Sequence, residues 1–387
     1  MADAWFTIHR SSLLPALSRV SDAIDTKSKI PILAHVLLQP DGATLRLRCT
    51  NLDLQIEAEC EMMDGANFPP VALPVSRLSA VLKEMPESAE LIFGPGRMKD
   101  QVGIRSGRSS FSLPCLPGGD FPEMGGRIDG DWIEIDGAKL AEALKKAAYA
   151  VNKADDRAYL CGFCLHGTES GDGMIVAATD GHYLVQVKMP GSGAVAFPEV
   201  ENSYPHIILP PMGADPIRKL LDGAKHGARI AVSAAKIAVA YDGVEIQSKL
   251  IDGTYPMYER VIPARTEQTI IVPREALASG VKRVAAMVDD AKNDGIRLKV
   301  ASDGLHIDML TAEGGFASDV VQGEINAPDG FIVAHSAPRL EKTLSGIQSV
   351  DIEISLTDET TAIVMRPLDG TPELYLLSAM RPRFVAE

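Results

Sequence analysis

Residues 132–153, WIEIDGAKLAEALKKAAYAVNK, hold the pattern that decides the fold. The first four residues alternate in polarity from Ile133 on and include β-branched and aromatic side chains, which predicts a short strand. From residue 138 to 153 the apolar side chains recur at helical spacing, with Leu140, Leu144 and Val151 on one face. A strand followed directly by an amphipathic helix is therefore the expected unit.

The same order recurs in the other two thirds of the 387-residue chain. Strand-like runs at 5–8 and 269–272 precede helical patterns at 11–23 and 274–290. Each third continues with an alternating strand, a second helix and a proline-containing corner. The predicted alternating strands are 45–51, 174–180 and 305–311, and the predicted second helices are 75–84, 215–222 and 337–345.

This layout predicts an α+β fold of three similar domains, each β-rich with two helices. The spacing of the repeat is too long for a solenoid and favours duplicated domains. The predicted domains are residues 1–127, 128–263 and 264–387.

Composition indicates a globular protein, and we expect it in the cytoplasm. Hydrophobic residues make up 46% of the chain, but no apolar run approaches the roughly 20 residues that a membrane helix needs. The N-terminus has no signal-peptide pattern, and five cysteines are not typical of a disulfide framework. We therefore expect no membrane association.

The net charge of −14 opposes nucleic-acid binding, unless the basic residues gather on one surface. On the helix at 138–153, Lys139, Lys146 and Lys153 recur every seven residues, away from the apolar face. Other predicted helices carry weaker basic faces. A charged helical face is usually only solvated, but its repetition on an acidic chain favours a surface that holds phosphates without reading bases.

No catalytic motif stands out. The chain lacks phosphate-loop, dinucleotide-binding and His-Glu-x-x-His patterns, and we expect neither a metal nor a cofactor. Cys161 and Cys164 have redox-motif spacing but lie in a run typical of a strand. Asp180-Gly181 after a strand favours a tight turn. The alternative is a cytoplasmic α+β hydrolase that uses His182 as the base and Asp180 as the residue that orients it.

Several segments resemble one family. Residues 179–184, TDGHYL, and residues 250–263, LIDGTYPMYERVIP, resemble segments of the bacterial sliding clamp, the beta subunit of DNA polymerase III. Residues 30–33, 51–54 and 107–113 resemble further segments in the same order, so the resemblance covers nearly the whole chain.

The resemblance implies a non-catalytic subunit with three similar domains. Two subunits would join head to tail into a ring, with helices lining the hole and sheets outside. The ring would encircle double-stranded DNA without reading its sequence. Implied partners are the DNA polymerase III catalytic subunit, the clamp loader, and other polymerases and repair proteins that carry short peptide motifs.

The resemblance also implies a peptide pocket between the second and third domains. Leucines and a pliable methionine suit a cleft that adapts to several ligands. Polar members could fix the peptide backbone. The matching positions are Leu160, Thr179, Gly181, His182, Tyr183, Leu184, Pro256, Arg260, Val261, Leu376, Ser378, Met380 and Arg381.

Departures from the family pattern concern the peptide preference of this pocket. Tyr183 stands where the family often has arginine, and Ser378-Ala379 replaces a common Met-Pro pair. The chain continues beyond Arg381 with a tail at 382–387, which could fold over the cleft. A paralogue specialised for another polymerase or for inhibitor tolerance is therefore a second possibility.

The resemblance places DNA contacts on the inner helices and nearby loops, and a subunit interface at the end of a third-domain helix. Met287 is the expected interface residue. The expected DNA contacts are Lys27, Lys29, Lys146, Lys153, Arg157 and Tyr159.

Overall fold

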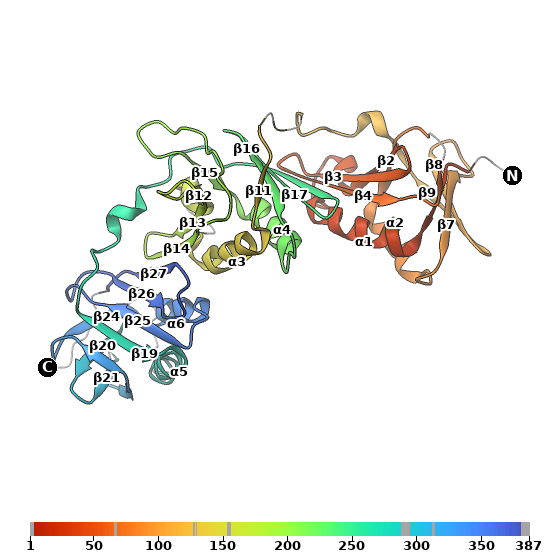
Figure 1. The fold of residues 1–387 in the computed structure, drawn as a ribbon. Coiled ribbons are helices and arrows are strands. Elements are labelled where there is room, and N and C mark those ends of the chain that lie inside the picture. The colour runs from red at the N-terminus through yellow and green to blue at the C-terminus, as the bar shows by residue number, and fades with distance from the viewer. Residues whose placement is uncertain are drawn as a thin grey trace. The chain divides into compact units, whose positions relative to one another are not determined.

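The computed structural model describes residues 4–65, 68–126, 128, 130–152, 156–287, 295–311 and 314–380. Figure 1 draws its helices and strands and labels those for which there is room. Contacts group the chain into two compact units that alternate along the sequence. The first unit comprises Met1–Ala138 and Met212–Leu250, and the second comprises Lys139–Pro211 and Ile251–Glu387.

The first unit contains two antiparallel sheets. Apolar side chains alternate along their strands, so that Phe6 and Ile8 are buried on one strand and Leu45 and Leu47 on another. The five-stranded sheet has the order β5 (Asp64–Gly65), β1 (Phe6–His9), β7 (Glu90–Pro95), β8 (Gln101–Ser106) and β9 (Ser109–Pro114).

The second sheet of this unit has nine strands and joins segments far apart in the sequence. Its strand order is β10 (Leu116–Pro117), β6 (Val71–Pro74), β2 (His35–Asp41), β3 (Thr44–Thr50), β4 (Leu54–Glu61), β18 (Val244–Lys249), β17 (Lys236–Tyr241), β16 (Ala228–Val232) and β11 (Ile133–Ile135). The β4–β18 pair joins strands from the predicted first and second domains.

The second unit also has a nine-stranded and a four-stranded sheet. The larger sheet runs β15 (His206–Leu209), β12 (Phe163–Gly167), β13 (Met174–Thr179), β14 (Tyr183–Met189), β27 (Glu373–Leu377), β26 (Ile363–Pro367), β25 (Asp351–Ser355), β19 (Thr269–Pro273) and β23 (Glu324–Asn326). The smaller sheet runs β22 (Phe316–Val321), β21 (Gly304–Leu310), β20 (Gly295–Ala301) and β24 (Ile332–Ser336).

Amphipathic helices accompany these sheets, and each buries its apolar face. The α-helices are α1 (Arg10–Val20), α2 (Val75–Glu84), α3 (Gly137–Ala147), α4 (Pro211–Leu221), α5 (Arg274–Ala285) and α6 (Ala337–Gly346). The 3₁₀ turns are η1 (Ser21–Ala23), η2 (Pro31–Ala34), η3 (Gly118–Asp120), η4 (Ala148–Ala150), η5 (Ala158–Cys161) and η6 (Tyr258–Val261).

The predicted elements agree with this structure, with differences at their ends. The helix predicted at 75–84 has those bounds, because Val75, Leu78 and Leu82 give it a continuous buried stripe. The helix predicted at 215–222 begins earlier, at Pro211, where a proline suits the first helical position.

Two helix predictions extend too far. The helix predicted at 138–153 is α-helical only to Ala147 and 3₁₀ to Ala150, and Val151 is extended. The helix predicted at 274–290 ends at Ala285, and residues 288–290 lie outside the described residues. Alanine-rich sequence near these ends continues the helical pattern without fixing where the helix stops.

The antiparallel sheets with a few helices confirm the α+β class. Among the described residues, no helix is both long and apolar enough to cross a membrane.

Candidate functional site

The segment that most resembled an enzyme motif is a tight turn between β13 and β14. Oδ1 of Asp180 accepts backbone hydrogen bonds from His182 and Tyr183, both at 2.8 Å. Gly181 has a φ of 90° and donates its N–H to Oγ1 of Thr179 at 3.1 Å. The prediction of a turn is confirmed, and the Asp180 carboxylate caps backbone N–H groups.

Tyr255 holds this turn against a second segment. The backbone N–H of Thr179 donates to the Tyr255 phenol oxygen at 3.0 Å, and the Tyr255 N–H donates to Nε2 of His206 at 2.9 Å. The Tyr255 side chain is completely buried, and this burial raises the pKa of its phenol. The chain that follows, which includes Pro256, is thereby fixed beside the turn.

Strand β27 brings a third segment to the same place. In the β14–β27 ladder, Leu184 lies opposite Leu376. The N–H of Ser378 donates to the carbonyl of His182 at 2.9 Å, and the N–H of Met380 donates to the carbonyl of Ala334 at 2.7 Å. Three segments far apart in the sequence therefore meet at the turn.

The predicted pocket residues divide into buried and exposed members. Leu160, Leu184 and Leu376 are 3%, 1% and 4% exposed, so little of their surface is free for a ligand. Leu184 and Leu376 pack in one apolar cluster with Tyr255. The members with exposed side chains, on which a ligand could first land, are His182, Pro256, Arg260 and Val261, and Val261 is 61% exposed.

Tyr183 lies in an aromatic cluster with a nearby cation. Its ring meets that of Tyr149 edge-on, with centroids 5.4 Å apart. Nζ of Lys342 lies 5.7 Å from the Tyr183 ring centroid and 5.8 Å from that of Tyr149. Burial, and then the nearby Asp180 carboxylate, raise the pKa of Tyr183. Tyr183 thus packs against Tyr149, at a position where the family often has a charged arginine.

The predicted DNA contacts lie in different surroundings. Lys27 and Lys29 are exposed in the loop between η1 and η2, and neither ammonium forms an ion pair with the part of the chain that is described. Lys146 is largely buried, and its ammonium pairs with Glu373, whose side chain is 3% exposed. Arg157 is exposed and Tyr159 half-buried.

The structure describes only some of the remaining predicted site residues. Met287 follows α5 and is 41% exposed, as an interface residue requires. Lys153, Arg381 and the tail at 382–387 lie outside the described residues.

The paired cysteines are not on one strand as predicted. Cys161 ends η5, before β12 begins, while Cys164 lies within β12. Cys164 is fully buried, and burial raises the pKa of its thiol well above the ordinary range. A buried thiol that resists ionisation is a packing residue.

Sequence reasoning missed the residues that hold the site together. Tyr255 was part of a quoted motif, but only the structure reveals its hydrogen bond to Thr179. His335 gave no signal; it is fully buried, and its Nδ1 lies 3.0 Å from the carbonyl oxygen of Ser378. Tyr149 and Lys342 also lacked a signal, because they approach Tyr183 only after folding.

Comparison with known proteins identifies the family. A family model for the DNA polymerase III beta subunit, N-terminal domain, matches residues 4–125, and a model for the central domain of that subunit matches residues 134–257. Together the two models match more than half of the chain. The chain belongs to the beta sliding clamp family.

Whole-length clamps agree with this assignment. The beta sliding clamp of Caulobacter vibrioides is 28% identical over 97% of this chain and 99% of its own length. That of Escherichia coli strain K12 is 26% identical over the same shares of the two chains. A crystal structure of the Pseudomonas aeruginosa sliding clamp superimposes with a TM-score of 0.88 at 25% identity, covering 98% of this chain and all of that one.

The fold is therefore the sliding clamp fold, and members of this family are non-catalytic processivity factors. The hydrolase reading of Asp180 and His182 is wrong. Asp180 is the cap of a turn that belongs to a clamp, where its carboxylate accepts two backbone N–H groups.

Proposed function

We propose that two copies of this chain form a ring around duplex DNA, which tethers polymerases and repair proteins through a peptide pocket. One observation carries the peptide pocket: the 179–183 turn, the segment after Tyr255 and the end of β27 meet at one place. Solved relatives support it, since one structure has the Pseudomonas aeruginosa clamp bound to griselimycin, and another has polyethylene glycol bound to the Caulobacter crescentus clamp at a region proposed to tether a beta motif.

In this proposal a partner peptide lands on the exposed side chains and rests above the buried leucines. Val261 would contact the apolar end of the peptide, and Arg260 and His182 would hold its polar groups. Thr179, Gly181, Leu160, Leu184 and Leu376 would form the support beneath. Tyr183, Ser378, Met380 and Arg381 would set the preference for one partner over another, which bears on whether this clamp is a specialised paralogue.

The proposed subunit has three domains, at residues 1–127, 128–263 and 264–387. The two family models support the first two, since they match residues 4–125 and 134–257. Head-to-tail pairing of subunits needs free sheet edges, and β9 and β22 are edge strands of the described sheets. Phe316 on β22 is 57% exposed, so its apolar side chain could contact a second subunit at that edge, and Met287 would be a second contact.

Lys27 and Lys29 are the strongest candidates for phosphate contact, because both are exposed and free of ion pairs among the described residues. Arg157 and Tyr159 are the next candidates, with Lys153. Lys146 could reach DNA only by leaving Glu373. The proposed partners are double-stranded DNA, the polymerase III catalytic subunit and the clamp loader, all in the cytoplasm.

Retention on DNA tests the ring. The clamp is loaded onto nicked circular DNA with a clamp loader and ATP, and the circle is then cut. We expect long retention on the circle and rapid loss from the linear ends. Equal retention on both forms would mean that the protein binds DNA by contact alone, and the proposal of a ring would fail.

A further inference from the structure

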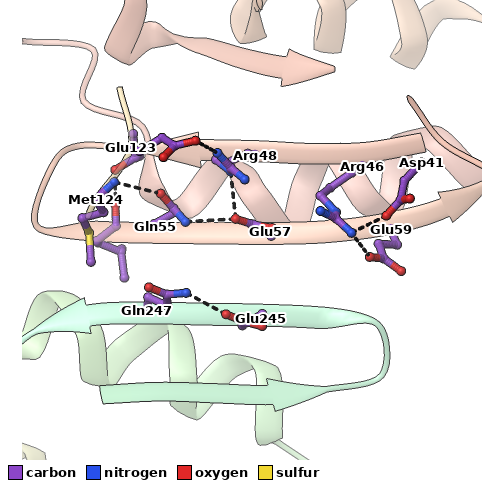
Figure 2. A network of polar contacts seen from close by, with 12 residues as sticks. Asp41, Arg46, Arg48, Gln55, Glu57, Glu59, Glu123, Met124, Glu245 and Gln247 are labelled. Carbon is purple, nitrogen blue, oxygen red and sulfur yellow. Dashed lines mark hydrogen bonds and ion pairs between the residues drawn. The ribbon is translucent and has the colours of Figure 1, made fainter. Parts of the chain in front are cut away.

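The polar face of the first unit's nine-stranded sheet has an unbalanced seam between β4 and β18. Glu57 on β4 lies directly opposite Glu245 on β18, and Gln55 lies directly opposite Gln247. Carboxylates placed opposite each other in an antiparallel pair repel and destabilise the sheet. Figure 2 shows these side chains with the arginines of β3.

The two carboxylates are compensated unequally. Glu57 has a cation beside it, since Nε of Arg48 lies 2.8 Å from its Oε1, and Nε2 of Gln55 donates to the same oxygen at 3.0 Å. Glu245 accepts only a hydrogen bond of 2.7 Å from Nε2 of Gln247, and it forms no ion pair with any described residue. One negative charge at the seam thus lacks a counter-charge.

Gln247 has a side-chain oxygen without a hydrogen-bond donor among the described residues. Its side chain is 4% exposed, and its Oε1 has no hydrogen-bond partner in the described structure. The amide cannot profitably turn over, because Oε1 would then face the Glu245 carboxylate. A buried carbonyl oxygen without a donor costs about 1–3 kcal/mol. Oε1 of Gln247 therefore adds a further uncompensated negative partial charge at the seam.

A hollow of about 490 Å³ lies beside this seam, within the range of about 300–1,000 Å³ typical of ligand sites. Its wall includes Glu57 and Glu245, and Ala240 leaves a gap in the row of longer side chains. Gln247 lines an adjoining hollow of about 390 Å³ that shares Glu57. The charge deficit and the unpartnered oxygen therefore lie side by side.

The remaining wall suits a planar cation. Glu59, Glu134 and Asp242 add negative charge, although Glu59 is paired with Arg46 and Asp242 with Arg19. Tyr241 lines the hollow and stacks on His226, which offers an aromatic surface for a guanidinium. Arg229 also lines this wall, and its guanidinium carbon lies 5.4 Å from the centroid of the Trp132 ring.

We propose that this hollow binds an arginine side chain from a basic segment of a partner protein. The guanidinium would pair with Glu245 and Glu57, and the negative partial charge of the buried Gln247 Oε1 nearby would favour its positive charge. Arginine fits better than lysine, because its fork of five N–H donors can serve several acceptors and its plane can stack on Tyr241. None of the residues that line this hollow is among those proposed above for the peptide pocket or for DNA contact.

The test titrates the full-length clamp with the labelled pentapeptide Ac-Gly-Arg-Gly-Arg-Gly-amide at about 0.15 M salt, where only near charges act strongly. The same peptide with citrulline in place of arginine, and free spermidine, serve as comparisons. We expect saturable binding of the arginine peptide alone. Equal binding of the citrulline peptide would overturn the charge recognition, and equal binding of spermidine would overturn an arginine site for a protein partner.

Two variants locate the binding. Glu245→Lys places an ammonium of the protein itself opposite Glu57, so the melting temperature should stay the same or rise. The affinity for the arginine peptide should fall by about tenfold or more. Ala240→Leu fills the gap without changing charge and should also weaken the peptide. Glu359→Lys makes the same charge change at an exposed site of the second unit and should leave affinity unchanged. Unchanged affinity in both hollow variants, or no binding by the wild type, would overturn the proposal.

Discussion

The backbone N–H of Thr179 donates a 3.0 Å hydrogen bond to the phenol oxygen of Tyr255, and this contact links two of the three segments that form the site. The Tyr255 side chain is fully buried, so the turn at 179–183 is positioned by the protein core. A partner peptide would then meet a surface whose backbone is already ordered, which lowers the entropic cost of binding.

Tyr255→Phe tests this tie. The ring stays, but the Thr179 N–H loses its acceptor, so we expect a loss of about 1–2 kcal/mol in the free energy of unfolding and weaker binding of a polymerase-derived peptide. Denaturant unfolding and fluorescence anisotropy measure the two effects. Tyr241→Phe is the matched control, because its phenol accepts the Lys225 N–H at 3.0 Å in the first unit. That control should lose stability alone; weaker peptide binding there would refute the local explanation.

Val261→Asp tests the landing surface of the peptide. Since Val261 is 61% exposed, the change should alter the free energy of unfolding by no more than about 0.5 kcal/mol. A carboxylate in place of an apolar contact should lower the affinity for the peptide by about tenfold or more. Val350→Asp, at a side chain that is 82% exposed, is the control and should bind peptide normally. Similar affinities for both variants would remove Val261 from the pocket.

Lys27→Glu combined with Lys29→Glu tests the DNA contact. Both lysines are exposed, so folding should be unaffected, while the clamp should leave circular DNA faster. If each lysine neutralises one phosphate, the slope of log affinity against log salt should shrink by about 2. Lys225→Glu with Lys299→Glu changes the net charge equally at other exposed positions. An equal effect in that control would show only a dependence on net charge.

Lys146→Met tests whether Lys146 supports the fold. It leaves the nearly buried Glu373 carboxylate without its cation, so we expect a loss of about 3–5 kcal/mol in the free energy of unfolding. Glu373 also accepts a hydrogen bond from the Tyr375 hydroxyl at 2.7 Å. Adding Glu373→Gln should restore much of the stability, since the unpaired charge is gone. A stable Lys146→Met protein that binds DNA weakly would instead make Lys146 a phosphate contact.

Acid should destabilise the second unit through His335. Burial lowers the pKa of His335 from its ordinary value near 6.5 to about 4. Between these values the unfolded chain binds a proton that the folded chain does not, so the free energy of unfolding falls as pH drops from about 6.5 to about 4. The fall from this group levels off near pH 4, at roughly 3 kcal/mol. His335→Gln should flatten the curve in this window, and an unchanged slope would assign it to other groups.

Much of the fold follows from local sequence. The helix at 75–84 has the predicted bounds because its buried residues recur at a spacing that only a helix aligns. The Asp180 turn is equally local, since its hydrogen bonds span two or three residues. The end of α3 could not be read in this way, because alanine-rich sequence continues the pattern beyond the helix.

The sequence by itself determined the repeated elements, the turn and the family, since each depends on residues close together or on motifs in a fixed order. Only the tertiary structure decided the rest. It placed Lys146 against Glu373, Tyr183 against Tyr149, and Glu57 opposite Glu245. Such pairs are set by how strands and helices that lie far apart in the chain pack together, and in a strand a slip of one residue would turn every side chain to the other face.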